Sequence, residues 1–201
     1  FSVAKLFFSY GLGNAMTFPM GVGATTALYP LRPTPDTVNE VMILVKPSIL
    51  FAVPTIYAAM IANLKKNSIK YQNLRRCVSA GEALPSQIGT DWKNITGVDI
   101  LDGVGSTEML HIFLSNKPND ITYGTSGSAV PGYDLKLVDE YGEEVAIGEI
   151  GELLVKGQSS AMCYWNKLTK SRNTFEGKWT RTGDKYEKIK DQKYIYSGRT
   201  D

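Results

Sequence analysis

The heptapeptide Gly103-Val-Gly-Ser-Thr-Glu-Met109 concentrates the residue types that phosphate chemistry needs. Its glycines let backbone N–H groups come close to an anion, and Ser106 and Thr107 add hydroxyl donors. Glu108 offers a hard carboxylate oxygen, and Mg²⁺ is usually bound by one or two carboxylates besides the substrate phosphates. The segment therefore suits a nucleotide α-phosphate with its magnesium ion. It is neither a Walker loop nor a dinucleotide fingerprint, so a glycine turn capped by Ser or Thr stays open as an alternative.

Two segments near the end of the chain carry residues suited to a ribose or a phosphate. Asp184, in Thr182-Gly-Asp184, can accept two hydrogen bonds from a ribose diol, although an aspartate-stabilised turn has the same sequence. Arg199 can reach a ribose or phosphate oxygen, or can be an ordinary solvated arginine. Each segment alone is weak evidence for a nucleotide site. The segments can form one site only if secondary-structure elements bring them together.

The first two-thirds of the chain alternates strand-like and helix-like segments. Strand-like segments are Thr25–Tyr29, Ser48–Val53, Arg76–Ala80 and Val98–Leu101, and helices are expected to begin near Pro35, Pro54 and Pro85. Strands separated by helices of about ten residues predict a mostly parallel sheet with helices on both faces. Ligands of such sheets bind beyond the carboxyl ends of the strands. Ala80–Glu82 and Gly103–Glu108 both follow a predicted strand, which favours a shared site.

The pattern changes after about Leu114, where helical spacing gives way to alternating strands. Strands are expected over Tyr133–Val138 and Gly151–Lys156, followed by a hairpin of Lys185–Lys190 and Tyr194–Ser197. We therefore predict two parts, an α/β part over 1–118 and a β-rich part over 119–201. The predicted fold class is α/β, a layered and mostly parallel sheet with flanking helices, followed by a β-rich, barrel-like subdomain.

Composition and charge argue against several classes of protein. The 201 residues carry a formal net charge of +2 with Lys and Arg scattered, which argues against nucleic-acid binding. The longest apolar stretches, Val41–Val45 and Ile49–Pro54, are far shorter than the roughly 20 residues that span a bilayer. Cys77 and Cys163 are far apart and the chain has one histidine, which disfavours a zinc site and favours free thiols in a reducing cytoplasm. Because the chain begins with Phe1 and not with Met, we expect a piece of a longer polypeptide.

The order of these segments along the chain is more specific than any one of them. The segments are SAGEALP (79–85), DGVGSTEM (102–109), GELLVKG (151–157), RTGDKY (181–186) and SGRTD (197–201). Over nearly the whole chain, this order resembles the acyl-adenylate-forming superfamily of acyl-CoA synthetases, luciferases and peptide-synthetase adenylation domains. AKLFFSYGLGN (4–14) and DGVGSTEMLHIFLSN (102–116) further resemble its aryl-CoA ligase branch, benzoate-CoA ligases in particular.

The resemblance implies an ATP-dependent enzyme that activates benzoate or a similar aromatic carboxylate as acyl-AMP and then forms its CoA thioester. It implies ATP or AMP, Mg²⁺ and coenzyme A as ligands, and a C-terminal domain of the same polypeptide beyond these residues. Two alternatives stay open on the sequence. One is an adenylating enzyme that loads a carrier-protein thiol, and the other is a non-catalytic nucleotide-binding or interaction domain of the same fold.

The resemblance also implies roles for residues of this chain. Thr107 and Glu108 correspond to catalytic positions, Thr107 contacting the α-phosphate and Glu108 binding the magnesium ion. The positions implied to contact the nucleotide are Gly81, Glu82, Ala83, Asp102, Gly103, Val104, Ser106, Asp184 and Arg199. Those implied to line the carboxylate-substrate pocket are Ser9, Tyr10, Gly105, His111 and Ile112. Asp201 corresponds to the hinge of the C-terminal domain.

Some features depart from the usual pattern of the superfamily. Most members have an aromatic residue where Val104 stands, and Lys185 replaces the more usual aliphatic residue. The pyrophosphate loop with its lysine and the adenylation lysine of the superfamily have no counterpart in these 201 residues, so we expect the chain alone to be nearly inactive. His111 is interpreted as a pocket wall and not as a general base, because a carboxylate nucleophile is already deprotonated at neutral pH.

Overall fold

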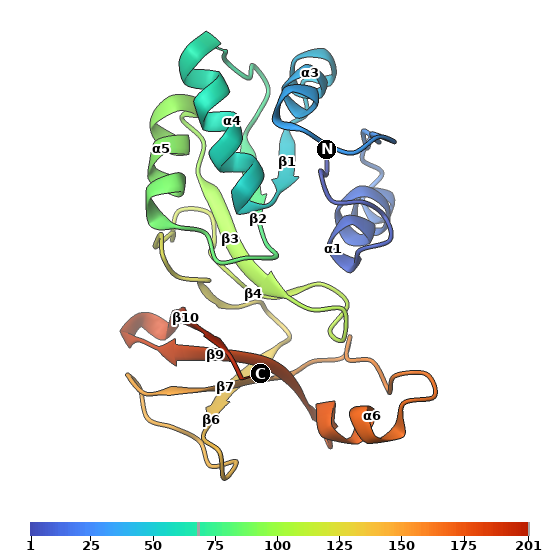
Figure 1. Cartoon of the computed structure of the whole chain (residues 1–201), viewed down its shortest axis with the longest axis vertical. Helices are drawn as coiled ribbons and strands as arrows, with labels where there is room; N and C mark the ends of the chain where they lie inside the picture. Colours follow the sequence, from blue (N-terminus) through green and yellow to red (C-terminus); the bar gives the residue numbers. More distant parts are fainter. Residues whose placement is uncertain (68, 201) are drawn as a thin grey trace.

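The computed structural model describes residues 1–67 and 69–200, which form two sheets with separate cores. In Figure 1 the helices α3, α4 and α5 lie with strands β1–β3 in the upper half, and β6, β7, β9, β10 and α6 lie in the lower half. The predicted fold class, α/β with a β-rich second part, is confirmed. Asp201, the expected hinge residue, lies outside the described residues. Within them, no helix is both long and apolar enough to cross a membrane.

The first sheet has the strand order β1-β2-β3-β4-β5. Its strands are Ile49–Ala52 (β1), Arg76–Ser79 (β2), Ile100–Gly105 (β3), Ile112–Ser115 (β4) and Ser128–Ala129 (β5). β1, β2 and β3 are parallel, whereas β3, β4 and β5 pair antiparallel. The helices are Pro35–Val45 (α3), Pro54–Asn67 (α4) and Ser86–Thr96 (α5). α4 contacts both α3 and α5, and together with β1–β3 they bury one apolar core.

The helix starts follow from local sequence chemistry. At α3, Thr34 accepts a hydrogen bond from the Thr37 N–H, Thr37 accepts one from the Thr34 N–H, and Pro35 occupies the first turn. These bonds satisfy N–H groups that a helix start leaves without an intrahelical partner. α5 ends at Gly97, whose φ of 76° needs the left-handed conformation that glycine adopts without strain. The proline and glycine positions therefore set the limits of these helices.

The segment before α3 differs from the prediction. Residues 9–21 form two short helical turns, Ser9–Leu12 (α1) and Phe18–Gly21 (α2), joined by a π-helical turn over Gly13–Thr17. The expected strand over Thr25–Tyr29 was wrong, because this segment has no regular structure. Two of the carbonyls in this region, those of Tyr29 and Leu31, instead accept hydrogen bonds from the Lys5 ammonium, both at 2.5 Å. The edge of β1 is occupied by the chain start, since Ser2 pairs with Phe51.

The second sheet is antiparallel, with the order β10-β9-β7-β6 and β8 paired to β9. Its elements are Asp134–Val138 (β6), Ile150–Lys156 (β7), Leu168–Thr174 (α6), Phe175–Glu176 (β8), Trp179–Lys188 (β9) and Tyr194–Arg199 (β10). Its core also takes in Met109, Phe113 and Leu114, which precede the predicted boundary at 118/119. That division of the chain therefore stays a prediction, and the two sheets share the β3–β4 hairpin.

The glycines of the opening heptapeptide lie in a strand and not in a turn, because β3 continues through Gly105. A Cβ on Gly103 would lie 2.8 Å from the Leu114 carbonyl oxygen, and one on Gly105 would lie 2.3 Å from the His111 oxygen. Neither glycine has a positive φ. They are needed for the close approach of β4, not for positive backbone angles. The hairpin loop 106–111 then carries Ser106, Thr107 and Glu108.

Replacing Gly105 by alanine is expected to lower the free energy of unfolding by about 1–3 kcal/mol, because the methyl group overlaps the backbone at His111. Urea denaturation measures the change. Gly21→Ala is the matched control, since an added Cβ there has nothing within 4 Å. Equal stability of the Gly105→Ala and Gly21→Ala variants would contradict the packing role of Gly105.

Candidate active site

Two cavities adjoin at the carboxyl ends of β2 and β3. The polar cavity has a volume of about 710 Å³ and extends from these strands to β9 and β10. The apolar cavity, of about 700 Å³, extends from the same strand ends to α1 and the start of α4. Both are lined by Gly81, Glu82, Gly105 and Ser106. The predicted position beyond the carboxyl ends of parallel strands is therefore where the structure has its two principal hollows.

The polar cavity brings together eight of the nine positions that we predicted to contact a nucleotide. They are Gly81, Glu82, Ala83, Gly103, Val104, Ser106, Asp184 and Arg199. The first six come from the loops and strands of the first sheet, whereas Asp184 and Arg199 come from β9 and β10 of the second. Folding thus joins segments that are 78 to 118 residues apart in sequence around one space large enough for a nucleotide.

Asp102, the ninth position, does not line the cavity. Its side chain is buried, and its Oδ2 accepts a hydrogen bond from the Leu84 N–H at 3.4 Å. Burial raises the pKa of Asp102 to about 7, although hydrogen bonds to the carboxylate oppose the shift. Asp102 therefore contacts the loop that carries Gly81 and Ala83 instead of the cavity itself.

Glu108 is half-buried in the wall of the polar cavity. Its Oε1 accepts a hydrogen bond of 2.5 Å from the Tyr164 hydroxyl. Burial raises the pKa of Glu108, but hydrogen bonds from Tyr164 and Ser106 and the nearby Lys170 outweigh it, so the net pKa lies below the ordinary value. The carboxylate is therefore ionised at neutral pH. The next residue, Met109, is fully buried and anchors the loop in the second core.

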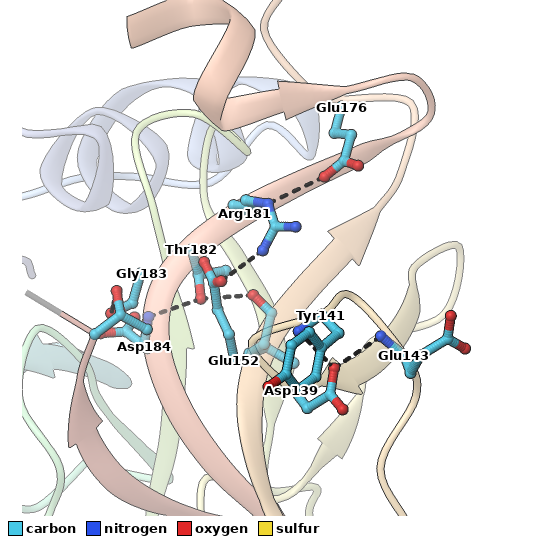
Figure 2. Close-up of polar contacts among 11 residues, drawn as sticks. Asp139, Tyr141, Glu143, Glu152, Glu176, Arg181, Thr182, Gly183 and Asp184 are labelled. Atoms are coloured by element: carbon cyan, nitrogen blue, oxygen red, sulfur yellow. Dashed lines mark hydrogen bonds and ion pairs between the residues drawn. The ribbon is translucent and has the colours of Figure 1, made fainter.

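Asp184 and Arg199 meet where β9 pairs with β10. The Arg199 guanidinium donates to Asp184 Oδ1 at 3.2 Å. Thr182 donates to the Leu153 carbonyl at 2.8 Å and accepts from the Asp184 N–H at 3.1 Å. Figure 2 shows this chain of contacts along β9, with Gly183 between Thr182 and Asp184. Because Gly183 has a φ of 73°, Asp184 follows a kink within a strand, where the sequence predicted a turn.

The same strand positions a charge cluster that the sequence analysis did not predict. The Arg181 guanidinium donates to Glu152 Oε2 at 2.6 Å and to Glu176 Oε2 at 3.0 Å. Figure 2 shows Arg181 between these two carboxylates. Arg181 and Glu152 both line the polar cavity. Since Arg181 is already paired with two carboxylates, its charge is compensated within the protein.

The apolar cavity contains all five predicted pocket positions, Ser9, Tyr10, Gly105, His111 and Ile112. The Tyr10 hydroxyl points to the sheet, where it donates to the Ala52 and Val78 carbonyls at 3.3 and 3.2 Å. Tyr10 therefore presents the apolar part of its ring to the cavity, and not the polar tip. Thr107, predicted to contact a phosphate, lines this cavity and is exposed.

His111 packs between aromatic rings at the wall of the apolar cavity. Its ring centroid lies 5.5 Å from that of Tyr10 and 4.7 Å from that of Phe18. Its Nε2 lies 3.3 Å from the Tyr10 carbonyl oxygen. Burial lowers the pKa of His111, and the contact with the Tyr10 carbonyl only partly offsets the shift. The imidazole is therefore neutral at physiological pH, as suits the wall of an apolar pocket.

Comparison with known proteins identifies the family. Residues 1–165 match the AMP-binding enzyme family. The chain belongs to this family. It is 58% identical over 202 aligned residues to a 4-hydroxybenzoate–CoA/benzoate–CoA ligase from Rhodopseudomonas palustris, covering 100% of this chain and 38% of that protein. The chain therefore spans well under half the length of that relative.

Two solved structures share the fold of this AMP-binding enzyme chain. A benzoate CoA ligase from Burkholderia xenovorans LB400 is 49% identical with a TM-score of 0.95, covering 99% of this chain and 41% of that one. An anthranilate CoA ligase, crystallised with anthranoyl-AMP, is 45% identical with a TM-score of 0.93, covering 99% and 39%. Both sheets described above therefore lie within the region that aligns with these two solved structures.

The donor set of this AMP-binding enzyme fits a magnesium ion that arrives with phosphates. The described residues contain no group of three or more His, Cys, Asp or Glu side chains able to hold a metal ion by themselves. Glu108 supplies one ionised carboxylate at the polar cavity. Mg²⁺ commonly takes one or two protein carboxylates and completes its shell with water and substrate phosphates. A single carboxylate is thus sufficient for a metal–nucleotide pair.

Several lining residues were not predicted from the sequence. Tyr164 and Lys170 follow β7 and lie near Glu108 only through the fold, since 56 residues separate Tyr164 from Glu108. No local pattern marks them. Arg181 belongs to the segment RTGDKY, which the sequence had already indicated because of Asp184. Its position near the nucleotide site could therefore have been predicted. The sequence of β9 did not predict which of its side chains line the cavity.

Proposed function

We propose that the chain is part of an ATP-dependent aryl-CoA ligase that acts on benzoate or a similar aromatic carboxylate. The carboxylate oxygen attacks the α-phosphorus of ATP, forming acyl-AMP and releasing pyrophosphate. The CoA thiol then displaces AMP from the acyl carbon and loses its proton. The observation that carries the proposal is that the polar and the apolar cavity adjoin. Their shared wall consists of Gly81, Glu82, Gly105 and Ser106.

The polar cavity is proposed to bind the nucleotide. Gly81–Ala83 and Gly103–Ser106 would surround the base, and Asp184, held by Arg199, would accept hydrogen bonds from the ribose hydroxyls. Glu108 would hold the magnesium ion, which neutralises phosphate charge when bound. Thr107, which lines the apolar cavity next to Ser106 of the shared wall, would donate to the α-phosphate.

The apolar cavity is proposed to bind the aromatic acid. Tyr10, His111 and Ile112 would contact the ring, with Ser9 and Gly105 completing the wall. The neutral imidazole of His111 adds no charge to this wall. The acid needs no general base, because carboxylates are ionised at neutral pH. These residues thus orient the carboxylate toward the shared wall, and positioning of this kind is a large part of adenylyl transfer catalysis.

The relatives support this proposal, because they are ligases of benzoate, 4-hydroxybenzoate and anthranilate with CoA. The experiment is a coupled assay of the intact enzyme that contains this chain, with ATP, Mg²⁺ and benzoate. Formation of benzoyl-AMP, followed by benzoyl-CoA on addition of CoA, would support it. If the benzoyl group is transferred only to a phosphopantetheinylated carrier protein, the thiol substrate is the carrier and not CoA. Absence of benzoyl-AMP would overturn the proposal.

Replacing Asp184 by asparagine is expected to weaken AMP binding by about 10- to 100-fold, because hydrogen bonds to a charged acceptor contribute about 1.5–3 kcal/mol. Isothermal calorimetry measures the affinity. Asp139→Asn is the matched control. The Asp139 carboxylate accepts hydrogen bonds from the Tyr141 and Glu143 N–H groups in an exposed turn (Figure 2), and Asp139 lines neither the polar nor the apolar cavity. Equal AMP affinity of the two variants would remove Asp184 from the nucleotide site.

A further inference from the structure

We infer that Tyr164 is a positioning residue for Glu108, and that its hydroxyl sets how tightly the metal–nucleotide pair is bound. The inference deepens the proposed function and rests on it. Tyr164 lies on the segment between β7 and α6. In sequence it is 56 residues from Glu108, which lies in the β3–β4 loop. Both side chains line the polar cavity, so the contact between them forms part of its wall.

Two hydrogen bonds join Glu108 itself to this segment. The Tyr164 hydroxyl donates to Glu108 Oε1 at 2.5 Å, and the Ala161 N–H donates to the Glu108 carbonyl oxygen at 2.7 Å. The first bond fixes the rotation of the carboxylate, and the second fixes the backbone that carries it. A carboxylate with its rotation fixed loses less conformational entropy when it binds a cation.

The Tyr164 ring is itself held in place. The Lys170 ammonium lies 4.6 Å from its centroid, and the Phe175 ring lies 5.4 Å from it. The Tyr164 N–H donates to Ser171 Oγ at 2.9 Å, which ties the residue to α6. Both the ring and the backbone of Tyr164 are thus restrained before any ligand arrives. Lys170 also lines the polar cavity, so it adds a cation at the same wall.

Tyrosine–carboxylate hydrogen bonds also occur for purely structural reasons, and this chain contains one. The Tyr123 hydroxyl donates to Asp99 Oδ1 at 2.8 Å. Neither Tyr123 nor Asp99 lines the polar or the apolar cavity. The two pairs share the same chemistry, but only the Tyr164 pair faces the cavity. Tyr123→Phe is therefore a matched control for Tyr164→Phe.

The test measures ATP binding by calorimetry on the intact enzyme, at several magnesium concentrations and in EDTA. Tyr164→Phe keeps the ring and removes only the hydroxyl. Outer-shell partners of metal ligands typically contribute 10- to 100-fold to metal affinity. We expect the magnesium concentration for half-maximal tightening of ATP binding to rise about tenfold, with ATP affinity in EDTA unchanged. Tyr123→Phe should leave both quantities unchanged.

A double-mutant cycle separates positioning from general weakening. In a Glu108→Ala background, Tyr164→Phe should have no further effect on magnesium-dependent ATP binding, because the carboxylate that it positions is gone. An unchanged magnesium dependence in Tyr164→Phe, an equal effect of Tyr123→Phe, or an additive effect in the Glu108→Ala background would each overturn the inference. Failure of the wild-type enzyme to form benzoyl-AMP would instead overturn the proposed function.

Discussion

Replacing Glu108 by alanine is expected to lower the rate of acyl-adenylate formation by about two to three orders of magnitude. Glu108 is the ionised carboxylate of the β3–β4 loop in the polar cavity. Preorganised charges at the phosphates supply a large part of catalysis in such transfers, and removing one contributor commonly costs about 10²–10³ in rate. Benzoate-dependent exchange of pyrophosphate into ATP, measured on the intact enzyme, reports this step.

Glu40→Ala is the control for the Glu108 prediction. Glu40 is an exposed glutamate on α3 and lines neither cavity. It should exchange pyrophosphate at the wild-type rate. Nucleotide binding adds a second measurement, since magnesium should no longer tighten ATP binding to Glu108→Ala. If magnesium tightens ATP binding to that variant as it does for wild type, Glu108 is not the metal ligand.

The 201-residue chain by itself is expected to exchange pyrophosphate at least about 100-fold more slowly than the intact enzyme. Among the described residues, the cations that line the polar cavity are Lys170, Arg181 and Arg199, and both arginines are paired with carboxylates of the chain, whereas adenylyl transfer requires cations that oppose the phosphate charge. The chain covers 38% of the relative from Rhodopseudomonas palustris, so more than half of such an enzyme lies outside it.

The activity of the isolated chain is measured by the same exchange assay, with the intact enzyme as the positive control. Calorimetry with AMP shows whether the polar cavity still binds nucleotide when exchange is lost. Exchange by the isolated chain at a rate near that of the intact enzyme would contradict the prediction. It would mean that all the groups needed for adenylate formation lie within these residues.

The sequence predicted those elements whose limits are determined locally. α3 begins at a Thr–Pro pair and α5 ends at a glycine, and both signals act within a few residues. The order of segments likewise predicted which loops would meet, because parallel strands present their carboxyl ends at one edge. The eight polar-cavity residues and the five apolar-cavity residues were implied by the resemblance to the acyl-adenylate-forming superfamily, and not by strand geometry alone.

The remaining features depend on contacts between distant segments. Thr25–Tyr29 has strand-like residues, but its carbonyl at Tyr29 accepts from Lys5, and the adjacent sheet edge is taken by Ser2. The pairing of Tyr164 with Glu108 likewise has no local sequence signal. The direction of the Tyr10 hydroxyl, which donates to carbonyls of the sheet, also has no local sequence signal.

The shared wall between the cavities has a consequence for how this scaffold can be varied. Two of the wall's four residues, Gly81 and Gly105, contribute no side chain, so at these positions the partition is backbone alone. Ser9, His111 and Ile112 line the apolar side alone, while Asp184 and Arg199 line the polar side alone. Under the proposed function, exchanging the former set is expected to change the choice of acid while the proposed nucleotide half is retained.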